Sequence, residues 1–188
     1  DWKKPTRGES WFPGETVMTA IGQGYIQTTP LQLGVMAAAL ANGGYRVTPH
    51  LARAIQDPIS GDREVLPHQR EPLNFARENP LALVQKAMRG VVGDRHGTAR
   101  RLRGGRVPLA GKTGTAQVVR IDRDREEELE PEEKERRVRD HALFVAYAPA
   151  DDPEIALAVV VEHGISGGKT AGRVARQVVD NYFSGPDS

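Results

Sequence analysis

The clearest apolar pattern in the chain predicts a helix over residues 30–41. Thr29 and Pro30 precede the apolar segment Leu31–Ala41, and Asn42-Gly43-Gly44 follows it. Threonine is a favourable N-cap, proline suits the first helical position, and glycine after the last apolar residue ends a helix. Because this segment is apolar almost all round, we expect the helix to be buried in a core.

A second helix is predicted from Asn79-Pro80, which repeats the cap-and-proline signal, to the glycines between Gly90 and Gly93. Apolar residues follow at helical spacing, namely Leu81, Val84, Ala87, Met88 and Val91. Residues 45–78 are dense in proline and charge, which allows short strands at most. Residues 1–28 are rich in Gly, Pro and Thr without a sustained period, so we expect a loop with turns at Pro13-Gly14 and Gly22–Gly24.

Three antiparallel strands and a final helix are predicted in the last part of the chain. The strands cover 109–119, 142–148 and 154–162, and 149–153 has the residues of a hairpin connection. Because 154–162 is a continuous Ile, Leu and Val run, we expect it to be a central strand covered on both faces. The helix over 171–183 carries Val174, Val178 and Tyr182 on one stripe. Helices packed on an antiparallel sheet make an α/β fold of the α+β type.

Residues 121–140 are almost wholly charged, with acids and bases nearly balanced. Glu132 with Arg136, and Glu133 with Arg137, have the spacing of helical ion pairs. We interpret this segment as a solvated excursion, part of it helical, and a peptide-binding role is the alternative.

Composition narrows the class of protein. The chain has 188 residues, 38% hydrophobic and 27% charged, which suits one globular domain. A net charge of +1 gives no field for nucleic acid, and the absence of cysteine excludes disulfides and thiolate metal sites. The longest apolar stretch, Leu33–Ala41, falls far short of the ~20 residues that cross a bilayer. The opening residues show no signal-peptide pattern, so we expect any membrane anchor to lie outside this chain.

The segment Gly111–Gln117, with the sequence GKTGTAQ, is the main candidate for chemistry. It lies inside a predicted strand and not before a helix, which disfavours a phosphate-binding loop. A glycine in a strand interior often marks close approach of a ligand or of another backbone. A lysine and two threonine hydroxyls can hold a carboxylate, and an edge strand can pair with an extended peptide. A surface strand with a bulge is the alternative on spacing alone.

Lys112-Thr113-Gly114 resembles the Lys-Thr-Gly motif of penicillin-binding proteins and serine β-lactamases. Other segments are similar, in the same order, to class B penicillin-binding transpeptidases and especially to their elongation-type members: Trp11–Thr16, Ile21–Tyr25, Thr29–Leu33, Leu40–Gly44, Gly97–Ala99 and Arg139–His141. The resemblance covers nearly the whole chain. It implies that residues 1–188 are the C-terminal part of a penicillin-binding transpeptidase domain, with the serine β-lactamase-like fold.

By this resemblance, Lys112 supplies positive charge near the nucleophile and the substrate carboxylate. The Thr113 and Thr115 hydroxyls bind the terminal carboxylate of a D-Ala-D-Ala stem peptide or of a β-lactam. The Thr115 backbone N–H donates to the oxyanion, and Gly114 lets the substrate lie flat against the strand. No metal or organic cofactor is implied.

The family's chemistry also needs a Ser-x-x-Lys nucleophile and a Ser-x-Asn or Ser-x-Asp motif. Ser166-Gly167-Gly168-Lys169 matches the first formally, but it lies downstream of Lys112 and its two glycines make a poor helix start. We interpret it as a turn before the last helix. We therefore expect the nucleophile in an upstream part of the domain that is absent from this chain, and we expect the chain alone to be inactive and poorly stable because its sheet lacks partners.

The resemblance implies a peptidoglycan D,D-transpeptidase of cell elongation that works through a serine acyl-enzyme and is acylated by β-lactams. Such enzymes act at the periplasmic face of the inner membrane with an elongation-complex glycosyltransferase. Three alternatives stay open: a division-type class B transpeptidase, a β-lactam sensor or β-lactamase, and a catalytically inactive scaffold with the same fold.

The five histidines are His50, His68, His96, His141 and His163, and none of them has the i, i+4 spacing of a helical metal site. His141 follows Asp140, but neighbours in a strand point to opposite faces, so we favour a structural histidine. For Trp11 and Tyr25, a groove-lining role and a loop-anchoring role are both open.

Overall fold

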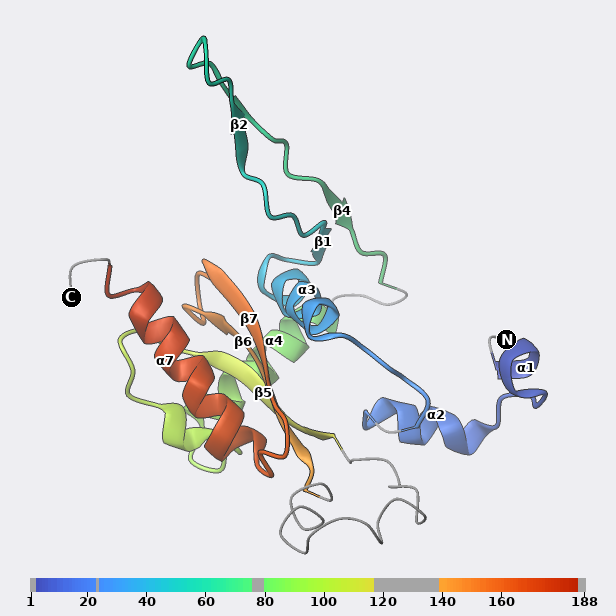
Figure 1. Ribbon diagram of the computed structural model, residues 1–188. Coiled ribbons are helices and arrows are strands. Elements are labelled where there is room, and N and C mark those ends of the chain that lie inside the picture. Colours follow the sequence, from blue (N-terminus) through green and yellow to red (C-terminus); the bar gives the residue numbers. More distant parts are fainter. Residues whose placement is uncertain (1–2, 23, 76–79, 117–138, 186–188) are drawn as a thin grey trace, which may run out of the picture.

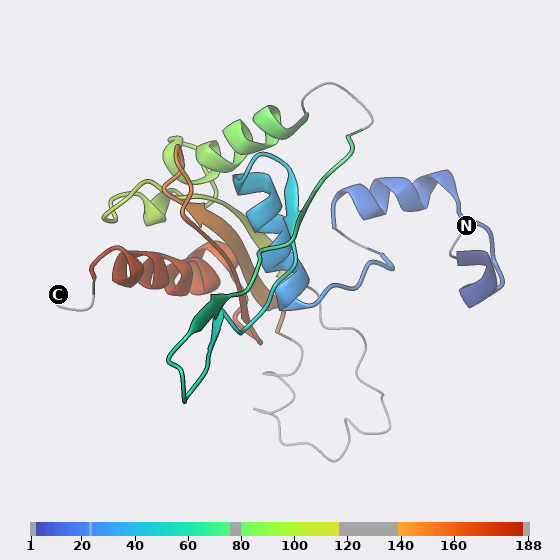
Figure 2. The ribbon, with the colours of Figure 1, turned by 90° about the horizontal axis from the view of Figure 1, so that it is seen from above.

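The computed structural model describes residues 3–22, 24–75, 80–116 and 139–185. Its centre is a three-stranded antiparallel sheet in the order β5-β6-β7, formed by β5 (Ala110–Ala116), β6 (His141–Ala148) and β7 (Ile155–Val161). Helix α3 (Pro30–Ala41) covers one face and α7 (Gly172–Tyr182) the other (Figures 1 and 2), while α4 (Pro80–Gly93) lies against β5. The predicted helices packed on an antiparallel sheet are confirmed. The charged segment 121–140 lies, except for its last two residues, outside the described residues.

The central strand of the described sheet is β6 and not β7. Phe144 pairs with Thr113 on one side and with Val159 on the other, and most of β6 is fully buried. β7 pairs only with β6 among the described residues, and most of its residues are half-buried. The expectation of a central strand over 154–162 is therefore wrong for this sheet. Apolar content showed that both faces are covered, but it does not say which strands pair at the edges.

Helix α3 begins and ends as predicted because its cap is built locally. The Gln32 N–H donates to Thr29 Oγ1 at 3.2 Å, and the Thr29 N–H donates to Gln32 Oε1 at 2.8 Å. The expectation that this helix is buried all round is wrong, however. Ala37 and Ala39 are buried, whereas Leu31 is 63% exposed and Met36 43% exposed. Within the described part of the chain, the helix is covered toward the sheet and α4 but exposed elsewhere.

The first 28 residues contain two helices where the sequence predicted loop. They are α1 (Lys3–Arg7) and α2 (Pro13–Ala20), so Pro13 begins a helix and not a turn. The missed signal is Glu15, whose Oε2 accepts the Phe12 N–H at 2.7 Å and so caps the helix that Pro13 starts. The side chain of Lys3 is buried, and it donates to Glu15 Oε1 at 2.6 Å.

The Lys3–Glu15 pair makes the stability of this region depend on pH. Lys3, followed by the Phe12 N–H, holds the pKa of Glu15 below its ordinary value. A depressed carboxyl pKa stabilises the folded state above the ordinary value, and this stabilisation is lost as the pH falls through the folded-state pKa. We expect a Glu15→Gln variant to melt at a lower temperature than the wild type at neutral pH, and this difference to shrink once the pH falls below 4.5.

Tryptophan fluorescence can follow that transition, because the Trp11 indole donates to Thr16 Oγ1 at 2.9 Å beside Glu15. Glu162→Gln is the matched control, because Glu162 is exposed and lies far from Glu15 in sequence. Its melting temperature should not show a pH-dependent difference from the wild type. A melting difference between Glu15→Gln and the wild type that does not vary with pH would contradict the expectation.

A long two-stranded arm projects from α3 (Figure 1). It consists of β1 (Tyr45–Val47) paired with β4 (Arg70–Pro72), and of β2 (Ala54–Gln56) paired with β3 (Arg63–Val65). Each strand has three residues, which confirms the expectation of short strands over 45–75, and residues 76–78 lie outside the described part. The arm is mostly exposed and takes no part in the central sheet.

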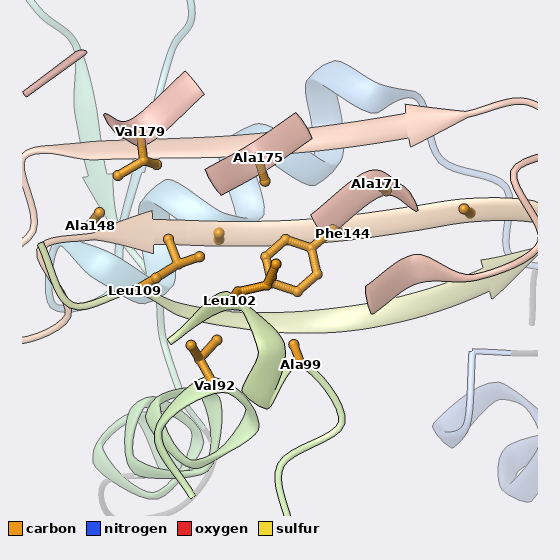
Figure 3. Packing of buried hydrophobic residues seen from close by; sticks show 11 residues of the cluster. Val92, Ala99, Leu102, Leu109, Phe144, Ala148, Ala171, Ala175 and Val179 are labelled. Atoms are coloured by element: carbon orange, nitrogen blue, oxygen red, sulfur yellow. The ribbon is translucent and has the colours of Figure 1, made fainter. Parts of the chain in front are cut away.

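The main hydrophobic core lies between the sheet, α7 and the 3-10 helix η1 (Arg100–Leu102), with Phe144 at its centre (Figure 3). On α7 the buried residues are Gly172, Ala175 and Val179, preceded by Ala171 in the π-helical turn η2 (Gly167–Ala171). Val174, Val178 and Tyr182, which the sequence places on one stripe of this helix, are exposed. The helix is confirmed, and its face toward the sheet carries small alanines that let it approach closely.

A second core cluster lies on the α3 face of the sheet and contains Tyr147, which is fully buried. Its hydroxyl has no hydrogen-bond partner in the described part of the chain, and burial raises the pKa of Tyr147. An unsatisfied buried hydroxyl costs free energy, so we expect Tyr147→Phe to leave the free energy of unfolding unchanged or to raise it by about 1 kcal/mol. Thermal or urea unfolding measures this.

The control for this change is Phe144→Ala in the main core, which should cost about 3–5 kcal/mol because it leaves a cavity. A clear loss of stability in Tyr147→Phe would show that the hydroxyl has a partner.

Candidate active site

The candidate motif lies on β5, which pairs with β6 alone among the described residues and so forms an edge of the sheet. The predicted strand is confirmed over Ala110–Ala116, and residues 117–119 lie outside the described part. Lys112 and Thr115 are exposed, while Thr113 and Gly114 are half-buried. The strand therefore offers this run of residues at a surface and not in the core.

Strand alternation separates the lysine from the two threonines. Ala110 belongs to the core cluster under α3, and Lys112 shares its face. Thr113 and Thr115 point to the other face, where η2 and α7 lie. The Lys112 Nζ turns back along the strand edge and donates to the Thr113 carbonyl oxygen at 2.7 Å. A substrate that contacts both the ammonium and the hydroxyls must therefore lie along the edge of the strand.

Thr98 holds the hydroxyl of Thr113. Their Oγ1 atoms are 3.2 Å apart, which joins the Gly97–Ala99 turn to the strand although 15 residues separate them in sequence. Gly168 packs against both threonines, since a Cβ there would lie 3.0 Å from the Thr98 carbonyl oxygen and 3.4 Å from Thr113 Cγ2. Sequence reasoning named Gly97–Ala99 only as part of a resemblance, and the hydrogen bond gives it a physical role.

Glycines let η2 lie directly on β5. A Cβ at Gly167 would be 2.5 Å from the Leu143 carbonyl oxygen and 2.6 Å from the Gly114 carbonyl oxygen, which no side chain allows. A Cβ at Gly114 would be 3.1 Å from Leu143 Cβ. The strand glycine thus has a packing reason, and its contact with a substrate stays a prediction.

The segment Ser166–Lys169 is part of the turn that begins η2, as the sequence interpretation held. The Ser166 hydroxyl accepts the Lys169 N–H at 3.4 Å and so caps the helical turn that leads into α7. Sequence reasoning overlooked one formal Ser-x-Asp match, Ser60-Gly61-Asp62. It lies at the turn between β2 and β3, at the tip of the arm and away from β5 (Figure 1), where the Ser60 hydroxyl donates to Asp62 Oδ2 at 2.8 Å.

The histidines form two pairs that sequence spacing did not reveal. His50 Nε2 and His68 Nδ1 are 2.8 Å apart on the arm, and His141 Nδ1 accepts the His163 backbone N–H at 3.0 Å. The second contact closes the turn after β7, which agrees with a structural His141. The part of the chain that the structure describes holds no group of three metal-binding side chains.

A basic hollow adjoins the candidate motif on the Thr113 face. It measures about 250 Å³ and is lined by Gly97, Thr98, Ala99, Arg100, Arg101, Ser166, Gly168 and Lys169. Arg100 and Arg101 come from a basic stretch over residues 100–106. None of the described helices is long and apolar enough to span a bilayer.

Comparisons with known proteins agree with this geometry. The family model of the penicillin binding protein transpeptidase domain matches residues 3–180. The peptidoglycan D,D-transpeptidase MrdA of Acinetobacter baumannii is 40% identical over 183 residues, which are 97% of this chain and 26% of that protein. The chain thus spans about a quarter of the length of this curated relative.

Two solved structures are similar in fold and sequence. The penicillin-binding protein 2 of Pseudomonas aeruginosa, in complex with WCK 5153, has a TM-score of 0.74 and 40% identity, over 99% of this chain and 37% of that one. The penicillin-binding protein 2 of Helicobacter pylori, in complex with MreC, has a TM-score of 0.73 and 32% identity, over 98% of this chain and 30% of that one. The chain therefore belongs to the penicillin-binding protein transpeptidase family, and within it to the class B, penicillin-binding protein 2 group.

Proposed function

We propose that the chain is the C-terminal part of a transpeptidase domain and supplies the substrate-binding strand of a peptidoglycan D,D-transpeptidase of cell elongation. The observation that carries this proposal is β5, an edge strand that presents Lys112 and Thr115 to solvent beside a Thr113 hydroxyl fixed by Thr98. Family membership and relatives named peptidoglycan D,D-transpeptidase support it.

In this proposal the nucleophilic serine comes from a segment outside the chain. That serine attacks the penultimate D-Ala carbonyl, terminal D-Ala leaves, and an amine of a neighbouring stem peptide takes the acyl group. Lys112 supplies positive charge at the site, and the Thr113 and Thr115 hydroxyls hold the terminal carboxylate. The Thr115 N–H stabilises the oxyanion, and such a donor contributes ~3–4 kcal/mol in comparable acyl-transfer sites. β-Lactams acylate the same serine.

The site acts at the periplasmic face of the inner membrane, and the chain alone lacks activity. The Helicobacter pylori relative was solved with MreC, which supports a protein of that kind as a partner. An elongation-complex glycosyltransferase is the further partner that the sequence resemblance implies.

Labelled penicillin tests the proposal on the complete polypeptide that contains these residues, with the 188-residue chain as control. We expect a covalent adduct that persists on the complete polypeptide and none on the chain alone. Rapid turnover of the adduct would identify a β-lactamase instead. No adduct on the complete polypeptide would identify an inactive scaffold, and an adduct on the chain alone would place the nucleophile within it.

A further inference from the structure

The basic hollow has the composition of an anion-binding site. Three of its lining residues are cationic, Arg100, Arg101 and Lys169, and none is acidic. Two further lining residues, Thr98 and Ser166, carry hydroxyls that can donate hydrogen bonds. Backbone turns at 97–99 and 166–168 hold the walls, and the glycine at 168 fits closely against Thr98.

Among the described residues, the cations of the hollow have no carboxylate partner. Within the described ranges, no ion pair involves Arg100, Arg101 or Lys169, although Arg176, for example, pairs with Asp180 at 2.7 Å. Arg100 donates from Nη1 to the Arg95 carbonyl oxygen at 3.1 Å, which is a neutral acceptor, so no described residue compensates its charge. Like charges that line one concave surface repel each other, and an anion bound between them relieves that repulsion.

The hollow lies next to the proposed carboxylate site, and Thr98 connects the two. Thr98 lines the hollow and its hydroxyl lies 3.2 Å from that of Thr113. A ligand whose carboxylate sits at Thr113 and Thr115 can therefore extend another group on the same α carbon past Thr98 into the hollow. Terminal D-Ala has only a methyl side chain to offer there, so the donor peptide leaves the hollow unfilled.

The molecule that can fill the hollow is the acceptor, whose amine takes the acyl group from the serine in the second step. Its amine attacks the acyl carbon from the side that the leaving amine of D-Ala vacated, because the two steps are one reaction in opposite directions. The nitrogen forms the new amide bond, the ester bond to the serine oxygen breaks, and the amine proton passes to that oxygen. An acceptor with a carboxylate beside its amine thus places this carboxylate at Thr113 and Thr115.

We propose that Arg101 and Lys169, with Arg100, form an anion subsite for a second carboxylate of the acceptor. This inference rests on the proposed transpeptidase function and adds the chemical class of the acceptor, an amine that bears two carboxylates. The subsite favours such an acceptor over a neutral one of equal size, because a carboxylate between two cations gains charge-assisted hydrogen bonds.

D-Glutamate and D-glutamine form a matched pair of probes, since they differ only in a side-chain carboxylate and its amide. The complete polypeptide is acylated with a D-Ala-D-Ala peptide, and transfer to each D-amino acid is measured by mass spectrometry of the exchanged peptide. Each partly exposed charge contact is worth about 1 kcal/mol, or about fivefold, so we expect D-glutamate to be used at least fivefold better than D-glutamine.

The Arg101→Gln/Lys169→Gln variant should bring the ratio of the two rates close to one, and each single variant should lie between. Arg106→Gln removes the same charge from an exposed position that does not line the hollow, and it should keep the wild-type ratio. The ratio cancels changes in folding or in acylation.

Equal use of the two acceptors by the wild type would overturn the subsite, and so would a double variant that keeps the preference. A loss of preference in Arg106→Gln would show a general charge effect instead of a subsite, and would also overturn it. A wild type that forms no penicillin adduct would refute the proposed function itself, which is a separate result.

Discussion

Lys112→Met in the complete polypeptide is expected to slow acylation by penicillin by about a hundredfold to a thousandfold. The proposed role of this ammonium is to stabilise charge at the reacting centre, and such interactions contribute most in the transition state. The methionine is an unbranched side chain one atom shorter, and it removes the charge and the N–H donors of the ammonium. Stopped-flow or gel-based kinetics with labelled penicillin measures the rate.

Two variants frame this prediction. Lys86→Met changes the same charge on an exposed position of α4 and should leave acylation at the wild-type rate. Lys112→Arg keeps the charge in a larger, planar group, so its rate should fall between those of the wild type and Lys112→Met. Near-normal acylation of Lys112→Met would remove Lys112 from the site.

The second large effect is expected from Gly167→Ala. The new Cβ would meet two backbone oxygens, those of Leu143 and Gly114, at about 2.5–2.6 Å, and neither can move without shifting β5 or β6. Overpacking of this kind costs about 1–3 kcal/mol of unfolding free energy. Because the displaced residue is Gly114, acylation by penicillin should fall together with the melting temperature.

Gly14→Ala is the matched control, because nothing lies within 4 Å of a Cβ at that position in α2. It should be neutral or slightly stabilising, since alanine favours a helix over glycine. A Gly167→Ala protein with wild-type melting and acylation would show that η2 can move away from the strand without cost.

Local signals account for the elements that the sequence predicted well. Helix α3 carries its own cap at Thr29 and Gln32, and α4 has Pro80 at its start. Other features depend on partners. The apolar residues of α7 predicted a helix, but which of its faces is buried depends on the fit of Ala175 against the sheet. The apolar content of β7 likewise does not determine the order of the strands, so it could not show that β6 is the central strand of the sheet.

The candidate site shows the same division. The Lys112–Thr115 run is local, so its strand could be predicted. The contacts that shape its surroundings join residues that are distant in sequence, such as Thr98 with Thr113 and Gly167 with Leu143. Neither periodicity nor a short motif carries such a pairing, and the hollow between residues 97–101 and 166–169 became visible only when the fold placed them together.

The flank of β5 that pairs with no other described strand has a consequence for selectivity. A ligand that binds as an added strand is recognised mainly through its amide groups, which all peptides share. Discrimination between ligands must then come from the charged groups at the ends of the ligand, and the part between its ends is free to vary. A surface of this kind tolerates chemically diverse compounds as long as each carries an amide and an acid at the right separation.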